Sequence, residues 1–157
     1  MKKNKKPLKP RSLLFGKLMS KVAISRLTRT MSTLISGGVP MLESLKITST
    51  TTGNVLIEKQ VLEARRLVAE GKTLHEAFKE AGNFPVMLIQ MVNVGEATGT
   101  LDEMLGKLAT FYDDEVEASV AALLSVMEPV LLICVGGIVG ALIISMYLPI
   151  FSLIQKF

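Results

Sequence analysis

Residues 129–154 read PVLLICVGGIVGALIISMYLPIFSLI, a run of 26 residues without a charged side chain. As a helix the run is about 39 Å long, and about 20 apolar residues are enough to cross the hydrocarbon core of a bilayer. A helix in a water-soluble core rarely stays apolar on every face over such a length. The run therefore predicts a transmembrane helix. Residues 118–128 add only one charge, Glu128, so we expect the helix to begin in water and enter lipid, with residues 118–157 as anchor and short tail.

The rest of the chain is long enough for one domain of about 115 residues ahead of the anchor. The 157 residues include no Trp and only 5% aromatic residues, so the core must come from Leu, Ile, Val, Met and Ala, which favours helices over strands. The single cysteine, Cys134, lies inside the apolar run, which excludes a disulfide framework and agrees with a reducing compartment. The N-terminus lacks the apolar segment of a signal peptide, so we expect the head domain to stay in the cytoplasm.

The net charge of +4 hides an asymmetry between the two parts of the head. Residues 1–66 hold 14 Lys and Arg against 3 Glu, whereas residues 67–117 hold 3 Lys against 10 Asp and Glu. Two interpretations stay open. The basic part meets an anionic membrane surface or an acidic partner, or the two parts face each other or a neighbouring subunit. A nucleic-acid partner is not expected, because no basic reading element with stacking aromatic residues is visible.

Glycine, proline and capping residues predict about six helices. Residues 1–12, with Pro7 and Pro10, look like a disordered basic arm, and an amphipathic helix follows over 13–35. A second helix covers 41 to about 49. The third starts after Asn54 and ends at Gly71, and the fourth starts at a capping box over 73–76 and ends near Gly82. The fifth covers 85–94 and stops at Gly95, and a second capping box over 100–103 starts the sixth. No strand-type alternation of useful length appears.

The expected fold is therefore all-α: an antiparallel bundle over residues 13–117, whose last helix continues into the transmembrane segment. An enzyme is not expected, because no phosphate loop, nucleophile elbow or His-containing triad is present. The lone His75 has no cysteine near it and predicts no zinc site, and we expect no cofactor. The acidic residues at 113, 114, 115 and 117 spread over more than one helical face, which favours a solvated face over partner contact, and partner contact over a calcium or magnesium site.

Residues 95–99, Gly-Glu-Ala-Thr-Gly, are the most distinctive stretch of the head. Two glycines bracket what reads as a short link before the sixth helix. Two roles are open for Glu96: to hold free N–H groups of that next helix, or to face an arginine of a partner. The first role is favoured.

Small residues recur within the apolar run in two pairs, Gly136 with Gly140 and Gly137 with Ala141. Such pairs let transmembrane helices approach closely, which predicts packing against another helix, although chance glycines facing lipid are the alternative. Pro129 and Pro149 are expected to bend the span or mark its edges. Glu128 beside Pro129 is either a carboxylate at the level of the lipid headgroups or a contact with a partner, and the paired role is favoured because charge at that depth is costly.

In order along the chain, these motifs resemble the F-type domain of type II secretion and type IV pilus platform proteins, the GspF, PilC and ComGB family. The resemblance runs from about residue 13 to the end and rests on three parts. The first is SGGVPMLESL at 36–45, with Gly38 and Pro40. The second is Phe84-Pro85 followed by the Gly95, Glu96, Thr98 and Gly99 signature. The third is Glu128-Pro129, the glycine-bearing span and the ending around Pro149.

The resemblance implies a six-helix cytoplasmic bundle on an inner-membrane anchor, which acts as an assembly platform and hydrolyses nothing. Its implied partners are a hexameric secretion or pilus ATPase, pilin or pseudopilin subunits, other inner-membrane platform components, further copies of itself and the lipid bilayer. Family members usually carry two copies of the domain and about three transmembrane helices. This chain carries one copy and one span, corresponding to the C-terminal half. The alternative function is a tail-anchored adaptor that tethers a cytosolic partner.

Overall fold

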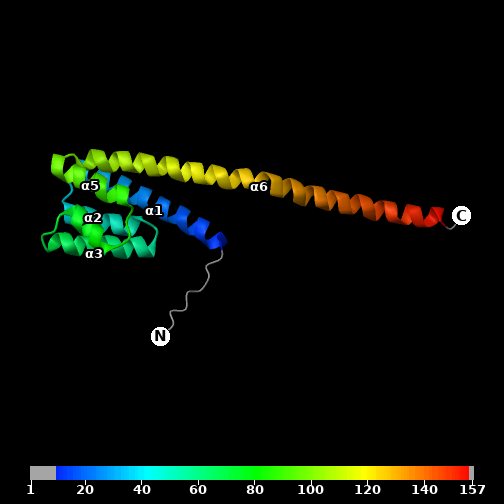
Figure 1. The fold of residues 1–157 in the computed structure, drawn as a ribbon, viewed down its shortest axis with the longest axis horizontal. Helices are drawn as coiled ribbons and strands as arrows, with labels where there is room; N and C mark the ends of the chain where they lie inside the picture. Colours follow the sequence, from blue (N-terminus) through cyan, green and yellow to red (C-terminus); the bar gives the residue numbers. More distant parts are fainter. Residues whose placement is uncertain (1–9, 156–157) are drawn as a thin grey trace, which may run out of the picture. The chain divides into compact units, whose positions relative to one another are not determined.

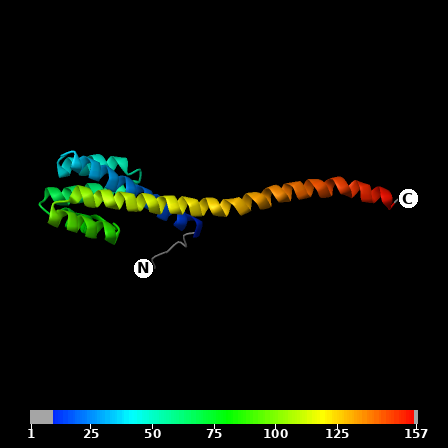
Figure 2. The ribbon, with the colours of Figure 1, turned by 90° about the horizontal axis from the view of Figure 1, so that it is seen from above.

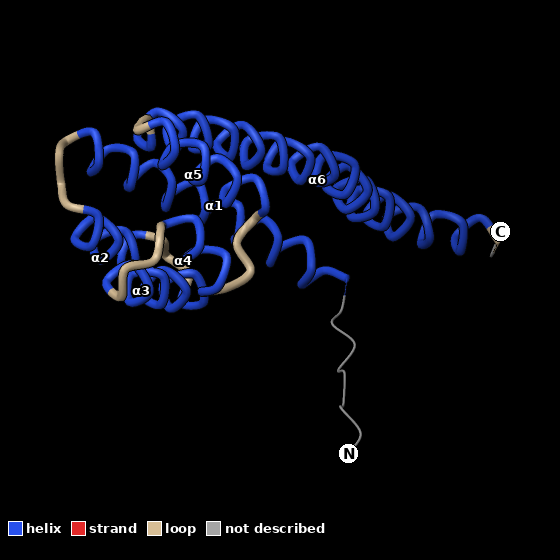
Figure 3. Tube along the Cα trace, turned by 60° about the vertical axis from the view of Figure 1, so that its left-hand side comes forward, coloured by secondary structure: helices blue, strands red, loops and turns tan. Residues whose placement is uncertain are grey.

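A computed structural model of the protein describes residues 10–155, and every element in this range is a helix. Six helices follow one another: α1 (Pro10–Ser36), α2 (Met41–Thr51), α3 (Val55–Ala69), α4 (Leu74–Ala81), α5 (Val86–Thr98) and α6 (Leu101–Ile154). Figures 1 and 3 show them joined by short loops. The predicted all-α class and the predicted continuation of the last helix into the apolar run are confirmed.

The contacts divide the chain into two units, residues 1–117 and 118–157. In the first unit, consecutive helices pack against each other from α1 to α5, and α1 runs beside the first part of α6 (Figures 1 and 2). One apolar core joins them. Its fully buried side chains include Leu27 and Met31 of α1, Phe78 of α4 and Leu105 and Leu108 of α6.

Several helix boundaries follow the predicted local chemistry. The Asn54 side chain accepts hydrogen bonds from the backbone N–H groups of Leu56 at 2.9 Å and Ile57 at 3.2 Å, which starts α3. The Glu76 carboxylate accepts from the N–H of Thr73 at 3.2 Å, as the first capping box predicts. A hydrogen bond from the Thr73 side chain, together with this one from its backbone, holds the pKa of Glu76 below its ordinary value.

Three predicted boundaries need correction. Helix α1 begins at Pro10 instead of residue 13, since a proline at a helix start loses no hydrogen bond; residues 1–9 of the predicted arm lie outside the described residues. Helix α5 does not stop at Gly95 but continues to Thr98, and Gly99 ends it in the left-handed conformation with φ 72°. At the start of α6, Glu103 pairs with Lys107 at 2.7 Å, and the Thr100 hydroxyl contacts that of Thr98 instead of completing a second capping box.

At Gly95 the backbone of α5 comes close to the start of α6. A Cβ on Gly95 would lie 2.8 Å from the backbone Cα of Leu101 and 3.3 Å from the Cβ of Met104. Backbone atoms cannot move aside as a flexible side chain does, so only glycine fits. The sequence pattern singled out Gly95 as the end of the fifth helix. In the structure Gly95 allows α5 and α6 to pack closely, and Gly99 forms the turn.

Gly95→Ala is expected to destabilise the head by about 1–3 kcal/mol, because the added methyl group forces α5 and α6 apart. The matched control is Gly16→Ala on α1, where an added Cβ meets nothing within 4 Å. There the better helix propensity of alanine should leave stability unchanged or raise it by up to about 1 kcal/mol. Chemical denaturation of the detergent-solubilised chain, followed by circular dichroism, measures both. Equal effects of the two substitutions would contradict the close approach.

Candidate functional site

The carboxylate of Glu96 caps the N-terminus of α4. Its Oε1 accepts from the backbone N–H of Leu74 at 2.6 Å, and its Oε2 accepts from the backbone N–H of His75 at 3.0 Å. These N–H groups have no partner inside their own helix, and a negative charge is favoured at the positive end of the helix dipole. Glu96 thus fastens α5 to α4 with charge-assisted hydrogen bonds.

His75 completes this cluster. Its Nδ1 lies 3.0 Å from Glu96 Oε2 and 3.1 Å from the hydroxyl of Thr73. The side chains of His75 and Glu96 are 29% and 25% exposed, so the pair is shielded from bulk water but reachable. The sequence indicated only that His75 has no cysteine near it and forms no zinc site, and the contact with Glu96 was not predicted. No sequence signal pointed to it, because the two residues are 21 positions apart on different helices.

Glu96 therefore has the kind of role that its position suggested, but for a different helix. It was expected to hold N–H groups of the sixth helix, which follows it in the chain. Because α5 continues past Gly95, the side chain of Glu96 projects from a regular helix toward α4 instead of from a link before α6. The backbone of the turn is satisfied separately: the N–H of Thr100 donates to the carbonyl of Gly95 at 3.0 Å.

Glu96→Gln is expected to lower the free energy of unfolding by about 1–3 kcal/mol, because the neutral amide is a weaker acceptor and places an NH₂ group against N–H donors. Glu117→Gln is the control, since Glu117 is exposed on α6 and should change stability by less than about 0.5 kcal/mol. Urea titration of both variants gives the comparison. Unfolding of Glu96→Gln at the wild-type urea midpoint would show that the Glu96 cap does not contribute to the free energy of unfolding.

A second polar cluster lines the seam between α1 and α6. Asp113 accepts hydrogen bonds from the Ser25 hydroxyl and the Arg29 guanidinium, and Lys21 pairs with Glu115 at 2.6 Å. At the other end of the seam, the Ser32 hydroxyl donates to the carbonyl of Asp102 at 2.8 Å. The order of these contacts shows that α1 and α6 run antiparallel.

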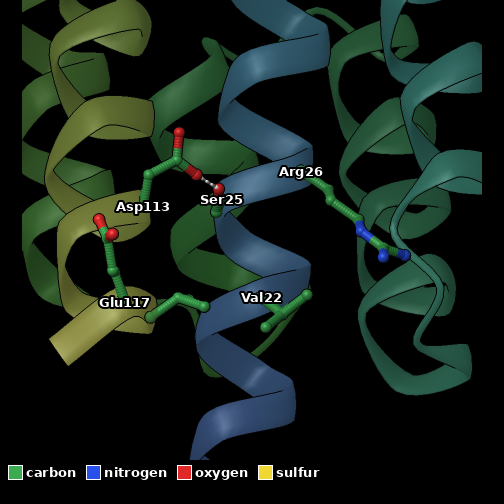
Figure 4. A pocket seen from close by; sticks show the side chains of 6 residues that line it. Val22, Ser25, Arg26, Asp113 and Glu117 are labelled. Carbon is green, nitrogen blue, oxygen red and sulfur yellow. Dashed lines mark hydrogen bonds between the residues drawn. The ribbon is translucent and has the colours of Figure 1, made fainter. Parts of the chain in front are cut away.

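Figure 4 shows the hollow beside Asp113, which has a volume of about 260 Å³. Asp113 turns toward Ser25, whereas Arg26 extends from α1 in the other direction. There Arg26 lies over Gly53: its Nη1 is 2.7 Å from where a Cβ on Gly53 would be. The hollow is lined by Val22, Ser25, Arg26, Asp113, Val116 and Glu117.

The acidic residues at 113–117 differ in whether they pair with α1 or are exposed to solvent. Asp113 and Glu115 turn toward basic residues of α1, whereas Asp114 and Glu117 are exposed. Among the described residues, no group of three or more His, Cys, Asp or Glu side chains is placed to hold a metal ion. The cluster is therefore partly a seam between helices and only partly the solvated face that the sequence favoured.

The pKa of Asp113 is held below its ordinary value, first by the hydrogen bond from Ser25 and then by Arg29. A carboxyl whose pKa is lower in the folded state stabilises the fold above its unfolded pKa of about 4, and this contribution is lost as the pH falls through the lower folded pKa.

Asp113→Asn should therefore flatten the loss of stability between about pH 5 and pH 3, where Asp113 begins to bind a proton in the unfolded chain. The control is Asp114→Asn, because Asp114 is exposed and adjacent in sequence. Thermal unfolding at a series of pH values tests both variants. Superimposable profiles for Asp113→Asn and wild type would contradict a stabilising role of this carboxylate.

The other motif residues of the head serve the turns and the core. Gly38 adopts φ 78° after α1, and Pro40 and Pro85 precede the first residues of α2 and α5. Phe84 is buried and packs edge-on against Phe78, with ring centroids 4.8 Å apart. The Thr98 hydroxyl donates to the carbonyl of Val94 at 2.8 Å. Gly95, Glu96, Thr98 and Gly99 all lie in the last turn of α5 and at its C-cap. The other motif residues of the head lie at the starts of α2 and α5 and in the core.

In the second unit, the predicted residues all lie on α6. Pro129 and Pro149 are inside the helix, and Glu128 is exposed. A Cβ on Gly136, Gly137 or Gly140 would meet nothing within 4 Å, so α6 borders open space at these three positions. Within the described residues, α6 is the one helix long and apolar enough to cross a membrane, with a mean hydropathy of 2.5 in its most apolar window.

The fold defines the class of this protein as an all-helical bundle whose last helix carries a candidate membrane span. Residues 27–149 match the family described as "Type II secretion system (T2SS), protein F", and the chain therefore belongs to this family. The family resemblance inferred from the sequence motifs is confirmed.

Curated relatives come from both secretion and pilus systems. The "Type IV pilus assembly protein PilC" of Myxococcus xanthus is 49% identical over 140 residues, which cover 89% of this chain and 34% of that protein. The PilC of Pseudomonas aeruginosa is 41% identical over 140 residues, covering 89% and 37%. The "Type II secretion system protein F" of Pseudomonas aeruginosa is 32% identical over 142 residues, covering 90% and 35%. The chain thus spans about a third of the length of the relatives it matches.

Proposed function

We propose that this chain is an inner-membrane platform subunit of a type II secretion or type IV pilus machine, coupling a cytoplasmic hexameric ATPase to the assembly of pilin or pseudopilin subunits. One observation carries the proposal: the family match runs from Leu27 in α1 to Pro149 in α6. It thus includes most of the helical head and most of the apolar run. The relatives support both kinds of machine, and the pilus assembly proteins are the more similar, at 49% and 41% identity against 32% for the secretion system protein.

In this proposal α6 anchors the chain in the cytoplasmic membrane and the head lies in the cytoplasm. The length and hydropathy of α6 support the anchor. The single cysteine, Cys134, lies in the apolar run, and a head without cysteine suits a reducing compartment. The platform carries out no chemical step, and the ATPase supplies the energy. Other platform components and further copies of the chain would pack against the small residues of α6.

The described contacts reduce the number of acidic head residues that could contact the ATPase. Glu96, Asp113 and Glu115 are used inside the head, so replacing them would first weaken the fold. Asp114 and Glu117 are exposed on α6 and remain as acidic candidates for contact with a basic partner.

The test is to extract the chain gently from the membranes of the cell that makes it and to identify what comes with it. We expect an ATPase and pilin-like subunits in the complex. The double variant Asp114→Lys with Glu117→Lys should lose the ATPase while keeping its helical content and membrane location. Glu43→Lys with Glu58→Lys, a charge reversal on α2 and α3, is the matched control.

Two outcomes would contradict the platform proposal. One is a chain that extracts alone or only with an unrelated soluble protein, which favours the tail-anchored adaptor. The other is a deletion strain that still assembles its pilus or pseudopilus and only mislocalises a cytosolic protein, because an adaptor tethers without taking part in assembly.

A further inference from the structure

The apolar part of α6 is longer than a bilayer can hold. Residues 118–154 contain one charged side chain, Glu128, and as a continuous helix they are about 55 Å long. The hydrocarbon core of a bilayer is about 30 Å thick, and the bilayer with both headgroup layers about 40–45 Å. A span that begins at Pro129, directly after the charge, crosses the core within about 20 residues. Residues 118–127, about 15 Å of helix, then lie outside the hydrocarbon core.

The side chains of residues 118–127 are sorted by size around the helix. The five large apolar ones are all exposed, from 40% for Leu123 to 64% for Val126. With Val120 as position a of a heptad, they fall at a, d, e and g, the positions that face a partner helix, whereas b, c and f hold only alanine and serine. The large residues, here called the apolar stripe, are Val120, Leu123, Leu124, Val126 and Met127; the outer ones are Ala118, Ala121, Ala122 and Ser125.

The same heptad pattern continues into the apolar run. Val130 and Gly137 repeat position d, and Cys134 and Ala141 repeat position a. Gly137 and Ala141 form one of the small pairs that predict packing against another helix, because small side chains let two transmembrane helices approach closely. The apolar stripe therefore follows the same face of α6 as this small pair.

The distribution of charge favours a second copy of this chain as the partner. Copies that enter one membrane through the same segment have parallel helices at the same depth, so in a symmetric pair each residue of the contact faces its own counterpart. A charge in the contact would then meet its like, which is strongly unfavourable. The one charge of residues 118–154, Glu128, falls at the outer position b, and every a, d, e and g position in this range is uncharged.

We propose that residues 118–127 of α6 are an interface between copies of this chain, in which two α6 helices pair in parallel through the apolar stripe. Because this segment lies outside the hydrocarbon core, burial of its large side chains from water drives the pairing there, whereas inside lipid close packing of small residues takes over. The inference rests on the membrane insertion of α6 that is part of the proposed function, and it does not depend on coupling to an ATPase.

Cysteine cross-linking of the full chain in membranes tests which face of the helix pairs. On a Cys134→Ser background, Leu123→Cys and Met127→Cys should each give a disulfide-linked dimer under a mild oxidant, because facing d and a positions bring their Cα atoms within about 7 Å. The matched controls are Ala122→Cys and Ser125→Cys, which are close by in sequence but at the outer positions c and f. They should stay monomeric.

The strength of the pairing is measured by sedimentation equilibrium of the detergent-solubilised chain. Leu123→Ala should raise the dissociation constant of the dimer at least about tenfold, because each copy loses a buried leucine side chain. Leu132→Ala is the control, since Leu132 is 69% exposed and falls at the outer position f. It should change the constant less than about twofold, because the side chain faces lipid or detergent in both states.

Four results overturn the proposal: equal cross-linking at the outer and stripe positions, no cross-linked dimer at any of the four positions, cross-links only to a different protein, or equal dissociation constants for the two leucine variants. A chain that is found in the membrane fraction but does not pair overturns this inference alone. A chain that is absent from the membrane fraction overturns the proposed function with it.

Discussion

The head depends on one carboxylate, that of Glu96, which meets the N-terminus of a helix with only eight residues. A helix as short as α4 is not stable by itself in water, and its free N–H groups need acceptors from outside. Glu76 supplies one acceptor from within the helix, and Glu96 supplies both of its oxygens from α5. The position of Glu96 depends in turn on Gly95, whose missing side chain lets α5 run close to α6. Three helices are thus joined through two adjacent residues.

The local signals in the sequence predicted most of the fold, and their failures have a common physical origin. Asn54 and Thr73 act within a few residues of themselves, so their roles could be inferred from spacing. Gly95 could not be interpreted correctly, because a turn and a close helix contact both require the absence of a side chain. Glu96 could be recognised as a cap, but its partner depends on packing between helices that are far apart in sequence. The contact with His75 has the same origin, and periodicity alone does not reveal it.

The charge asymmetry of the sequence allowed two interpretations, and the described contacts support the one in which the two parts of the head face each other. At the seam, Lys21 and Arg29 of the basic part face Glu115 and Asp113 of the acidic part. Such exposed pairs contribute little to stability, so the register of α1 on α6 is set mainly by buried residues such as Leu27 and Leu108. Ahead of Lys21, residues 1–20 hold seven Lys and Arg and no Asp or Glu.

The burial of Tyr112 in the seam has a consequence for spectroscopy. The chain has no tryptophan and two tyrosines, of which Tyr112 is buried in the head and Tyr147 lies in the apolar run. Tyr112 also contacts the ring of Phe111 edge-on, with centroids 5.5 Å apart, so its ring sits in an asymmetric environment. Replacing Tyr147 with phenylalanine would leave one phenol in the whole protein. Its fluorescence and near-ultraviolet dichroism would then report the seam between α1 and α6 without any attached label.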